Sequence, residues 1–325
     1  MHVNWHKIKI YTTPAGIDPL TGVLLNLGIT GFEIEDSDDF KRFLSGTEAH
    51  WDYVEDSLMY KASCETNVTI YLPDNAQGAD TFALVKSSLD TLRAKDKTGQ
   101  FGRLEYEMDN IKEEDWANNW KQYFKPFNIG DKLIIKPSWE SLDNADGKII
   151  LEIDPGSSFG TGQHFTTKLC LEYVADLTPH GAHVLDLGCG SGILSIGAIL
   201  FGAKSACAVD IDQNAAKKAS ENAALNKISP DIYKTYFGDA LEDKSLHDLL
   251  TRNKADIIFA NIVADVLIAF SSHFKSFLKP KGSLVVSGII GERADEVISA
   301  LSACGFSLIS KKEEGGWCAA HLKSL

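Results

Sequence analysis

The chain has 325 residues, which is enough for two domains, because single hydrophobic cores stop growing at around 250–300 residues. Its formal net charge of −13 argues against sequence-independent binding to nucleic acid, which needs a basic face, and no run of about eighteen apolar residues is present to span a membrane. The N-terminus also lacks the apolar segment of a signal peptide, so we expect a cytoplasmic protein that does not act at a membrane.

Acidic residues are concentrated in residues 1–110, which hold 18 Asp and Glu against 10 Lys and Arg. This excess favours a neutral or basic partner, although acidity can also serve solubility alone. The six cysteines form no CxxC pair, so we expect neither a zinc site nor a disulfide framework.

Residues 1–110 predict a smaller N-terminal α+β domain. The hydrophobic pattern alternates between strands and helices in the order strand–helix–strand, strand–helix–strand, which is typical of a ferredoxin-like unit. The expected strands are 5–12, 31–36, 67–74 and 102–111, and the expected helices are 17–29 and 79–95. Residues 111–147 then predict a helix, stopped by Pro126, and an ordered linker.

From residue 148 the pattern becomes strand–helix–strand–helix, which predicts an α/β domain over 148–325. Short apolar runs separated by helical segments favour a doubly wound, mostly parallel sheet of seven strands, a Rossmann-like arrangement. The expected strands are 183–188, 205–212, 231–238, 255–262, 282–289, 306–314 and 317–324.

Two glycine-rich runs lie in succession, "DPGSSFGTGQHFTT" at 154–167 and "VLDLGCGSGIL" at 184–194. The second places Gly188, Gly190 and Gly192 directly after a strand and before a helix, where glycine permits a sharp turn and a close approach of the backbone to a ligand. Ile193 stands where a dinucleotide-binding loop needs its third glycine, which argues against an NAD-dependent dehydrogenase.

Polar residues end the neighbouring strands. We expect Asp210 to accept hydrogen bonds from the hydroxyls of a ribose, and Asp239 with Ala240 to lie at an adenine edge. Asn261 ends the fourth strand at the same carboxyl edge of the sheet. Asp239 alone could instead cap a helix.

With this glycine loop and these polar residues at the strand ends, the segment 180–325 resembles the class I S-adenosylmethionine-dependent methyltransferases. The first glycine run, together with "WANNWKQYFKPF", "KPSW" and "ANI", closely resembles the ribosomal protein L11 methyltransferase family over roughly 110–325. Phe165 is a departure, since this family usually has proline there. The resemblance implies S-adenosylmethionine as cofactor, S-adenosylhomocysteine as product and no metal.

The resemblance also assigns roles to residues. It implies that Thr167, Gly188, Asp210 and Asn261 contact the cofactor, and that the first run is a lid over the reactive methyl group, formed by Phe159, Gly160, Thr161 and Gly162. We expect Asn261 to orient the acceptor amine. His164 is either a base or, as we favour, an anchor of local hydrogen bonds.

By the same resemblance, the enzyme methylates lysine side chains and the N-terminal amine of ribosomal protein L11, free or ribosome-bound. The N-terminal domain then serves substrate recognition, and we expect a monomer. Three alternatives stay open: another protein substrate, an adenine or glutamine nitrogen, and a non-catalytic binding scaffold. The stretch "ANIVAD" lacks the prolines and tyrosine of an N-P-P-Y motif, which argues against adenine or glutamine.

Overall fold

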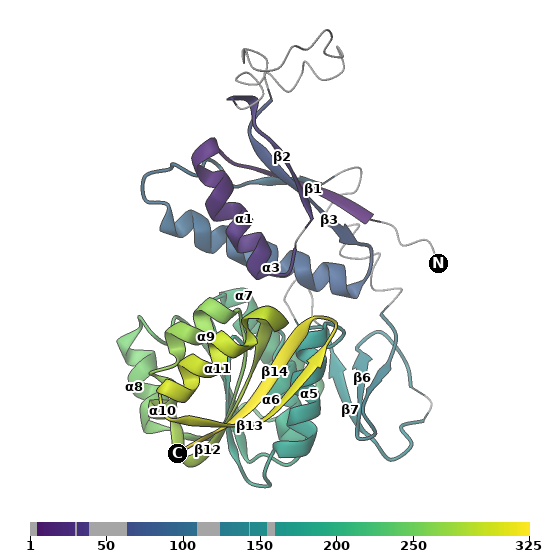
Figure 1. Cartoon of the computed structure of the whole chain (residues 1–325). Helices are drawn as coiled ribbons and strands as arrows, with labels where there is room; N and C mark the ends of the chain where they lie inside the picture. The colour runs from purple at the N-terminus through teal and green to yellow at the C-terminus, as the bar shows by residue number, and fades with distance from the viewer. Residues whose placement is uncertain (1–4, 30, 39–63, 109–123, 143, 155–159) are drawn as a thin grey trace. The chain divides into compact units, whose positions relative to one another are not determined.

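The computed structural model describes residues 5–29, 31–38, 64–108, 124–142, 144–154 and 160–325 (Figure 1). The chain divides into two compact units, Met1–Asn119 and Trp120–Leu325, which we call unit 1 and unit 2. The helix expected at the start of 111–147 falls almost wholly on residues 109–123, outside the described residues. No helix in the described ranges is long and apolar enough to cross a membrane.

Unit 1 contains the strands and helices that the sequence predicts. Its antiparallel sheet has the strand order β2-β3-β1-β4, so the ferredoxin-like prediction is confirmed. The elements are β1 (Trp5–Tyr11), α1 (Ile17–Asn26), β2 (Phe32–Glu35), β3 (Asn67–Pro73), α3 (Ala76–Lys95) and β4 (Tyr106–Met108), with a short 3₁₀ helix at Pro14–Gly16.

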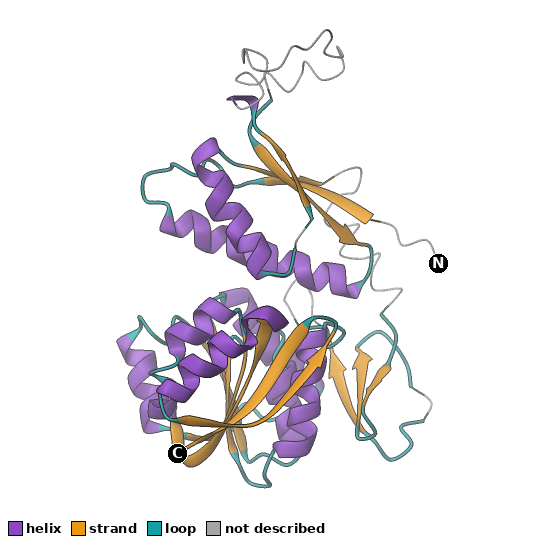
Figure 2. Ribbon diagram, in the orientation of Figure 1, coloured by secondary structure: helices purple, strands orange, loops and turns teal. Residues whose placement is uncertain are grey.

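The two α-helices in the described part of unit 1, α1 and α3, cover the same face of its sheet (Figure 2). The burial of β1 alternates along the strand, because successive side chains point to opposite faces of a sheet. The apolar side chains on the covered face form the core of the unit with those of α1 and α3: Ile8, Ile10, Leu20, Leu24, Val68, Ile70, Phe82, Val85 and Leu89.

Unit 2 contains a seven-stranded sheet with the strand order β10-β9-β8-β11-β12-β14-β13. The first five strands are parallel and β14 is antiparallel, which confirms the predicted doubly wound sheet. Its strands are β8 (His183–Leu187), β9 (Ser205–Asp210), β10 (Tyr233–Phe237), β11 (Ala255–Asn261), β12 (Leu278–Ile290), β13 (Phe306–Glu314) and β14 (Trp317–Ser324).

Helices pack on both faces of this sheet (Figure 1). One face carries α5 (Phe165–Leu177), α6 (Ile193–Leu200) and α7 (Gln213–Leu225). The other carries α8 (Lys244–Arg252), α9 (Ala264–Phe270), α10 (Phe274–Phe277) and α11 (Ala294–Ala303), after a 3₁₀ turn at Gly291–Arg293. A continuous apolar cluster between the sheet and this second group fixes the strands, and with them the sheet edge where ligands bind in such folds.

A smaller three-stranded sheet, β5-β6-β7, precedes α5 in unit 2. Its strands are β5 (Phe127–Ile129), β6 (Leu133–Pro137) and β7 (Ile149–Ile153). Two of them lie where the sequence predicted only a linker. Phe124 is fully buried there against the rings of Phe127 and Trp139, so this region is a packed part of unit 2.

Candidate active site

The four strand ends that the sequence singled out lie side by side. Strands β10, β9, β8 and β11 are adjacent and parallel, so their carboxyl ends share one edge of the sheet. Asp210 ends β9, Asn261 ends β11, and Asp239 follows β10 by two residues. The structure therefore brings these residues to the edge where open α/β sheets bind ligands.

The second glycine run forms a tight loop between β8 and α6. Gly188, Gly190 and Gly192 have φ values of 73°, 53° and 79°, a region that favours glycine. A Cβ on Gly188 would lie 2.2 Å from Ile262 Cγ2, and one on Gly192 would lie 2.5 Å from the Tyr233 hydroxyl. There is thus no room for a side chain at Gly188 or Gly192, and the loop requires glycine at both positions.

The carboxylate of Asp210 is hydrogen-bonded to this loop. Its Oδ2 accepts a hydrogen bond from the Gly190 N–H at 2.8 Å, and its Oδ1 accepts one from the Asp212 N–H at 2.9 Å. Burial raises the pKa of this carboxyl, while these N–H donors act in the opposite direction. Each carboxylate oxygen can accept two hydrogen bonds, so the carboxylate keeps acceptor capacity for the hydroxyls of a ribose.

Asp239 and Ala240 differ in what they can offer a ligand. The exposed carboxylate of Asp239 accepts a hydrogen bond from the Leu241 N–H at 2.8 Å and so stabilises a local turn. It does not cap α8, whose N-cap is Asp243. The Ala240 side chain is buried in the apolar cluster, so only its backbone can meet an adenine edge.

Asn261 and Thr167 join the end of β11 to the first turn of α5 at this edge. Asn261 Nδ2 donates to Thr167 Oγ1 at 3.3 Å, and Thr167 lies buried in the first turn of α5. Asn261 Oδ1 is also buried but accepts no hydrogen bond from any described residue. A buried acceptor without a donor is costly, so this atom fits a ligand that brings an N–H group.

His164 is the N-cap of α5. Its Nδ1 lies 2.8 Å from the Thr166 hydroxyl and 3.3 Å from the Thr166 N–H, and its ring meets Trp317 edge to face at 4.9 Å between centroids. Burial lowers the pKa of this imidazole to about 4, so it is neutral at pH 7. These contacts favour the anchoring role over that of a base.

The described part of the expected lid packs closely on the second run. Gly160 and Gly162 have φ values of 106° and 87°, and Thr161 Oγ1 accepts a hydrogen bond from the Gln163 N–H at 3.2 Å. A Cβ on Gly162 would lie 3.0 Å from Ile193 Cδ1. Phe159 lies outside the described residues.

The sequence reasoning missed Asp186, which is fully buried on β8 within the first residues of the second run. Its Oδ2 accepts from the Ser195 hydroxyl at 2.6 Å and the Ser195 N–H at 3.1 Å, while its Oδ1 accepts from no described residue. Burial raises its pKa to about 6. The missed signal was an acidic residue at an inward position within the apolar strand "HVLDL".

Ile211 was also missed. It directly follows Asp210 at the sheet edge, and 56% of its side chain is exposed. Exposed apolar side chains beside a candidate ribose site offer a surface for a planar base. Among the described residues, no group of three or more His, Cys, Asp or Glu side chains is arranged to hold a metal ion.

Comparisons with known proteins converge on one family. The family model described as "Ribosomal protein L11 methyltransferase (PrmA)" matches residues 4–324. Proteins named ribosomal protein L11 methyltransferase from Acetivibrio thermocellus and Thermoanaerobacter pseudethanolicus are 39% and 37% identical to this chain. The alignments cover 99% of both chains in the first case and 98% of both in the second.

A solved structure is similar as well. The crystal structure of a ribosomal protein L11 methylase from Lactobacillus delbrueckii subsp. bulgaricus matches with a TM-score of 0.56 and 31% sequence identity. It covers 62% of this chain and 100% of that chain.

Proposed function

Because the chain belongs to the ribosomal protein L11 methyltransferase family, we propose that it transfers methyl groups from S-adenosylmethionine to amines of ribosomal protein L11. The observation that carries this proposal is the pair formed by Asn261 and Thr167, which leaves a buried amide oxygen unsatisfied beside a glycine loop. The acceptors are lysine side chains and the N-terminal amine.

The residues at the sheet edge fit S-adenosylmethionine. The loop of Gly188, Gly190 and Gly192 would hold its methionine part, Asp210 its ribose, and Asp239 with the Ala240 backbone its adenine. Thr167 Oγ1 accepts from Asn261, so its O–H is available to donate to the carboxylate, near a helix N-terminus that favours negative charge. When bound, the cofactor supplies an electrophilic methyl group on a positively charged sulfur.

The acceptor amine must present a lone pair. A lysine has a reference pKa near 10.4, so its neutral form costs about 4.6 kcal/mol at pH 7, whereas an N-terminal amine with a pKa near 8 costs about 1 kcal/mol. Desolvation and a neighbouring positive charge both lower this cost, because they disfavour the ammonium. Asn261 Oδ1 supports the geometry by accepting a hydrogen from the amine, and placing reactants in line contributes several kcal/mol more.

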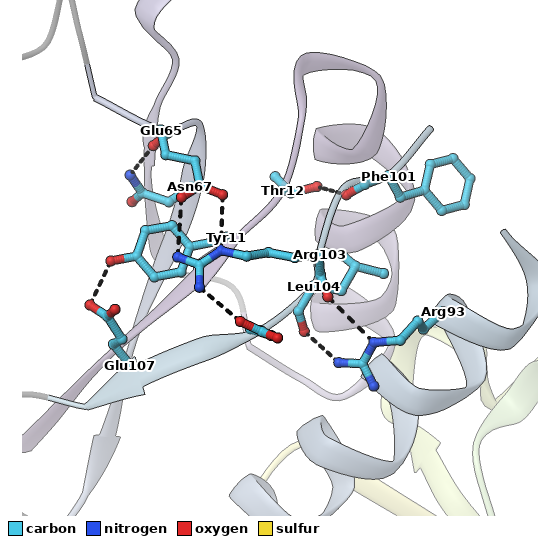
Figure 3. Close-up of polar contacts among 10 residues, drawn as sticks. Tyr11, Thr12, Glu65, Asn67, Arg93, Phe101, Arg103, Leu104 and Glu107 are labelled. Atoms are coloured by element: carbon cyan, nitrogen blue, oxygen red, sulfur yellow. Dashed lines mark hydrogen bonds and ion pairs between the residues drawn. The ribbon is translucent and has the colours of Figure 1, made fainter. Parts of the chain in front are cut away.

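We assign substrate recognition to unit 1. The face of its sheet that α1 and α3 leave uncovered carries acidic and aromatic side chains. Arg103 donates to Glu65 at 3.0 and 3.1 Å and to Glu105 at 2.8 Å, and it lies over the Tyr11 ring (Figure 3). Tyr11 in turn donates to Glu107 at 2.6 Å.

Two further glutamates lie on this face. Glu35 accepts from Lys9 at 3.2 Å, and Glu33 accepts from the Tyr71 hydroxyl at 3.0 Å. Carboxylates therefore outnumber the cations that they contact here, which supports a basic partner. Long-range charge mainly raises the rate of association.

Salt dependence tests this assignment. Raising the ionic strength from about 0.05 to about 0.5 M shortens the Debye length severalfold, so kcat/KM for ribosomal protein L11 should fall by about tenfold. The Kd for S-adenosylhomocysteine, which binds in unit 2, should change much less. Equal salt sensitivity of both constants would contradict a recognition role for the acidic face.

A transfer assay tests the reaction and its target. Purified enzyme is incubated with radiolabelled S-adenosylmethionine and total ribosomal proteins, which are then separated on a gel. We expect label in one band, ribosomal protein L11. Label in another band would contradict the target, and no label from an enzyme that binds S-adenosylhomocysteine would favour the non-catalytic scaffold.

The same proposal places the enzyme in the cytoplasm, where ribosomal proteins are made, and as a monomer that acts on free or ribosome-bound substrate. Light scattering during size-exclusion chromatography should give the mass of one chain, 35.6 kDa. A mass of twice that value would contradict the monomer.

A further inference from the structure

One buried amide on α7 connects the two glycine runs. Asn222 is fully buried, and its Oδ1 accepts a hydrogen bond from the Asp154 N–H at 2.9 Å. Its Nδ2 donates to the Ser191 carbonyl at 2.8 Å. Asp154 begins the first run and Ser191 lies within the second, so a single side chain from outside both runs holds them together.

The side chain of Ser191 forms a second connection between the two runs. Its hydroxyl is fully buried and donates to the Gly160 carbonyl at 2.7 Å. A Cβ on Gly160 would lie 2.6 Å from Ser191 Oγ, so the close approach requires glycine at this position. The first run is thereby fixed at Asp154 and again at Gly160, and both attachments pass through Ser191 or its partner Asn222.

We propose that Ser191 and Asn222 are positioning residues that align the first glycine run with the second, so that cofactor affinity depends on this hydrogen-bonded link. The inference rests on the proposed function, in which the second run holds S-adenosylmethionine. The groups that do this are the Ser191 hydroxyl and the Asn222 amide, and each forms hydrogen bonds with backbone groups of the runs.

Both side chains are buried, so the hydrogen bonds that they make are costly to lose. Removing a side chain that satisfies a buried carbonyl or N–H leaves that group without a partner, which costs more than an exposed hydrogen bond is worth. The runs then populate the aligned arrangement only part of the time. Apparent affinity falls in proportion to the fraction of molecules that are competent to bind, without loss of any direct contact.

The chain offers a matched control in Asn226, one helical turn further along. Its Oδ1 accepts from the Glu152 N–H at 2.9 Å and its Nδ2 donates to the Glu152 carbonyl at 2.6 Å. The Asn226 side chain thus also connects the end of α7 to the backbone of strand β7, and its Nδ2 donates to the Asn222 carbonyl at 2.8 Å within the helix. Its side chain differs from that of Asn222 in bonding no residue of the second run.

The experiment measures the Kd for S-adenosylhomocysteine by titration calorimetry, and the Tm without ligand, in the full chain and three variants. We expect Ser191→Ala and Asn222→Ala to raise Kd by about tenfold, and Asn226→Ala to raise it by less than about twofold. Asn222→Ala and Asn226→Ala should both lower Tm. The double variant Ser191→Ala/Asn222→Ala should raise Kd at least as much as the product of the single effects predicts, because the two substitutions remove separate attachments of the first run.

Two results would overturn the inference. One is an unchanged Kd in Ser191→Ala, which removes a single hydroxyl and keeps the fold even if Asn222→Ala does not. The other is a rise in Kd for Asn226→Ala equal to that for Asn222→Ala, because affinity would then follow stability alone. If the unsubstituted chain fails to bind S-adenosylhomocysteine, the proposed function itself fails, and this outcome is distinct from both.

Discussion

The amide of Asn261 donates to the hydroxyl of Thr167 at 3.3 Å, which joins the end of strand β11 to the first turn of helix α5. The two residues are 94 positions apart in the chain. Thr167 is the last residue of the first glycine run. Asn261 ends β11, which is adjacent to β8, the strand that leads into the second glycine run. The Oδ1 of Asn261, which accepts no hydrogen bond from any described residue, therefore lies at the end of a strand adjacent to β8.

Replacing Asn261 by alanine should therefore affect turnover more than binding. We expect Asn261→Ala to lower kcat by about 100-fold, because a misoriented amine loses much of the gain from alignment. Steady-state kinetics with ribosomal protein L11, together with a calorimetric Kd for S-adenosylhomocysteine, separate the two effects. Unchanged turnover with normal cofactor binding would show that Asn261 does not orient the amine.

The positive φ angle of Gly192 predicts a steep cost for a side chain there. An added Cβ would lie 2.5 Å from the Tyr233 hydroxyl and 2.9 Å from Ala219 Cβ. Gly181 has a similar φ, 77° against 79°, but open space around it. Both alanine variants carry backbone strain of about 1–2 kcal/mol, and Gly192→Ala adds a steric clash.

Thermal unfolding and cofactor titration of these two variants distinguish strain from clash. We expect Gly192→Ala to have the lower Tm and to lose measurable binding of S-adenosylhomocysteine, whereas Gly181→Ala binds normally. Equal effects of both substitutions would mean that φ alone, and not the packing of the loop, governs the site.

The carboxylates Asp210 and Asp239 should differ in their effect on affinity. Asp210 accepts a hydrogen bond from the Gly190 N–H of the loop, while Asp239 is exposed and, apart from its proposed contact with adenine, accepts one from the Leu241 N–H of a local turn. We expect Asp210→Ala to raise the Kd for S-adenosylhomocysteine by at least about tenfold, since it removes an acceptor for hydroxyls and a support of the loop. Asp239→Ala should raise it by much less, and the reverse order would contradict the assignment of the ribose to Asp210.

The lowered pKa of His164 should make the stability of the folded chain depend on pH. Its pKa is about 4 in the folded chain and 6.5 ordinarily, so the unfolded chain binds more protons between these values. The stability that this residue contributes is therefore present above pH 6.5 and is lost as the pH falls towards 4. His164→Asn keeps a residue that caps helices well but removes the titration.

Urea unfolding of the unsubstituted chain and of His164→Asn at several pH values measures this contribution. Between pH 7 and pH 4, the unsubstituted chain should lose about 3 kcal/mol more free energy of unfolding than His164→Asn loses. The raised pKa of Asp186 acts in the opposite direction, but it is present in both proteins and cancels in the difference. Parallel pH profiles would contradict a neutral, buried His164.

The positions of Asp210 and Asn261 could be predicted from the sequence because each ends a short apolar strand in a regular strand–helix pattern. In such a pattern the carboxyl ends of parallel strands meet at one edge, so a local signal fixes a tertiary position. The ferredoxin-like fold of unit 1 was predictable from its repeated strand–helix–strand pattern. Short strands such as β5 and β6 carry a weaker pattern and were read as a linker.

Other features depend on contacts that no local pattern encodes. In the sequence, Asn222 resembles any other asparagine within a helix. Only in the folded chain does its amide oxygen accept a hydrogen bond from Asp154 and its amide nitrogen donate one to Ser191. Asp186 owes its raised pKa to complete burial, which depends on the packing of α6 over β8. The general site could thus be predicted, but not the hydrogen bonds that hold its two glycine runs together.

The most direct test of the central claim is peptide mass spectrometry of purified ribosomal protein L11 after incubation with the enzyme and S-adenosylmethionine. We expect mass increases in steps of one methylene group, confined to lysine side chains and the N-terminal amine, and strongly reduced with the Asn261→Ala enzyme. Methyl groups on any other kind of atom, or an unmodified protein despite normal binding of S-adenosylhomocysteine, would contradict the claim.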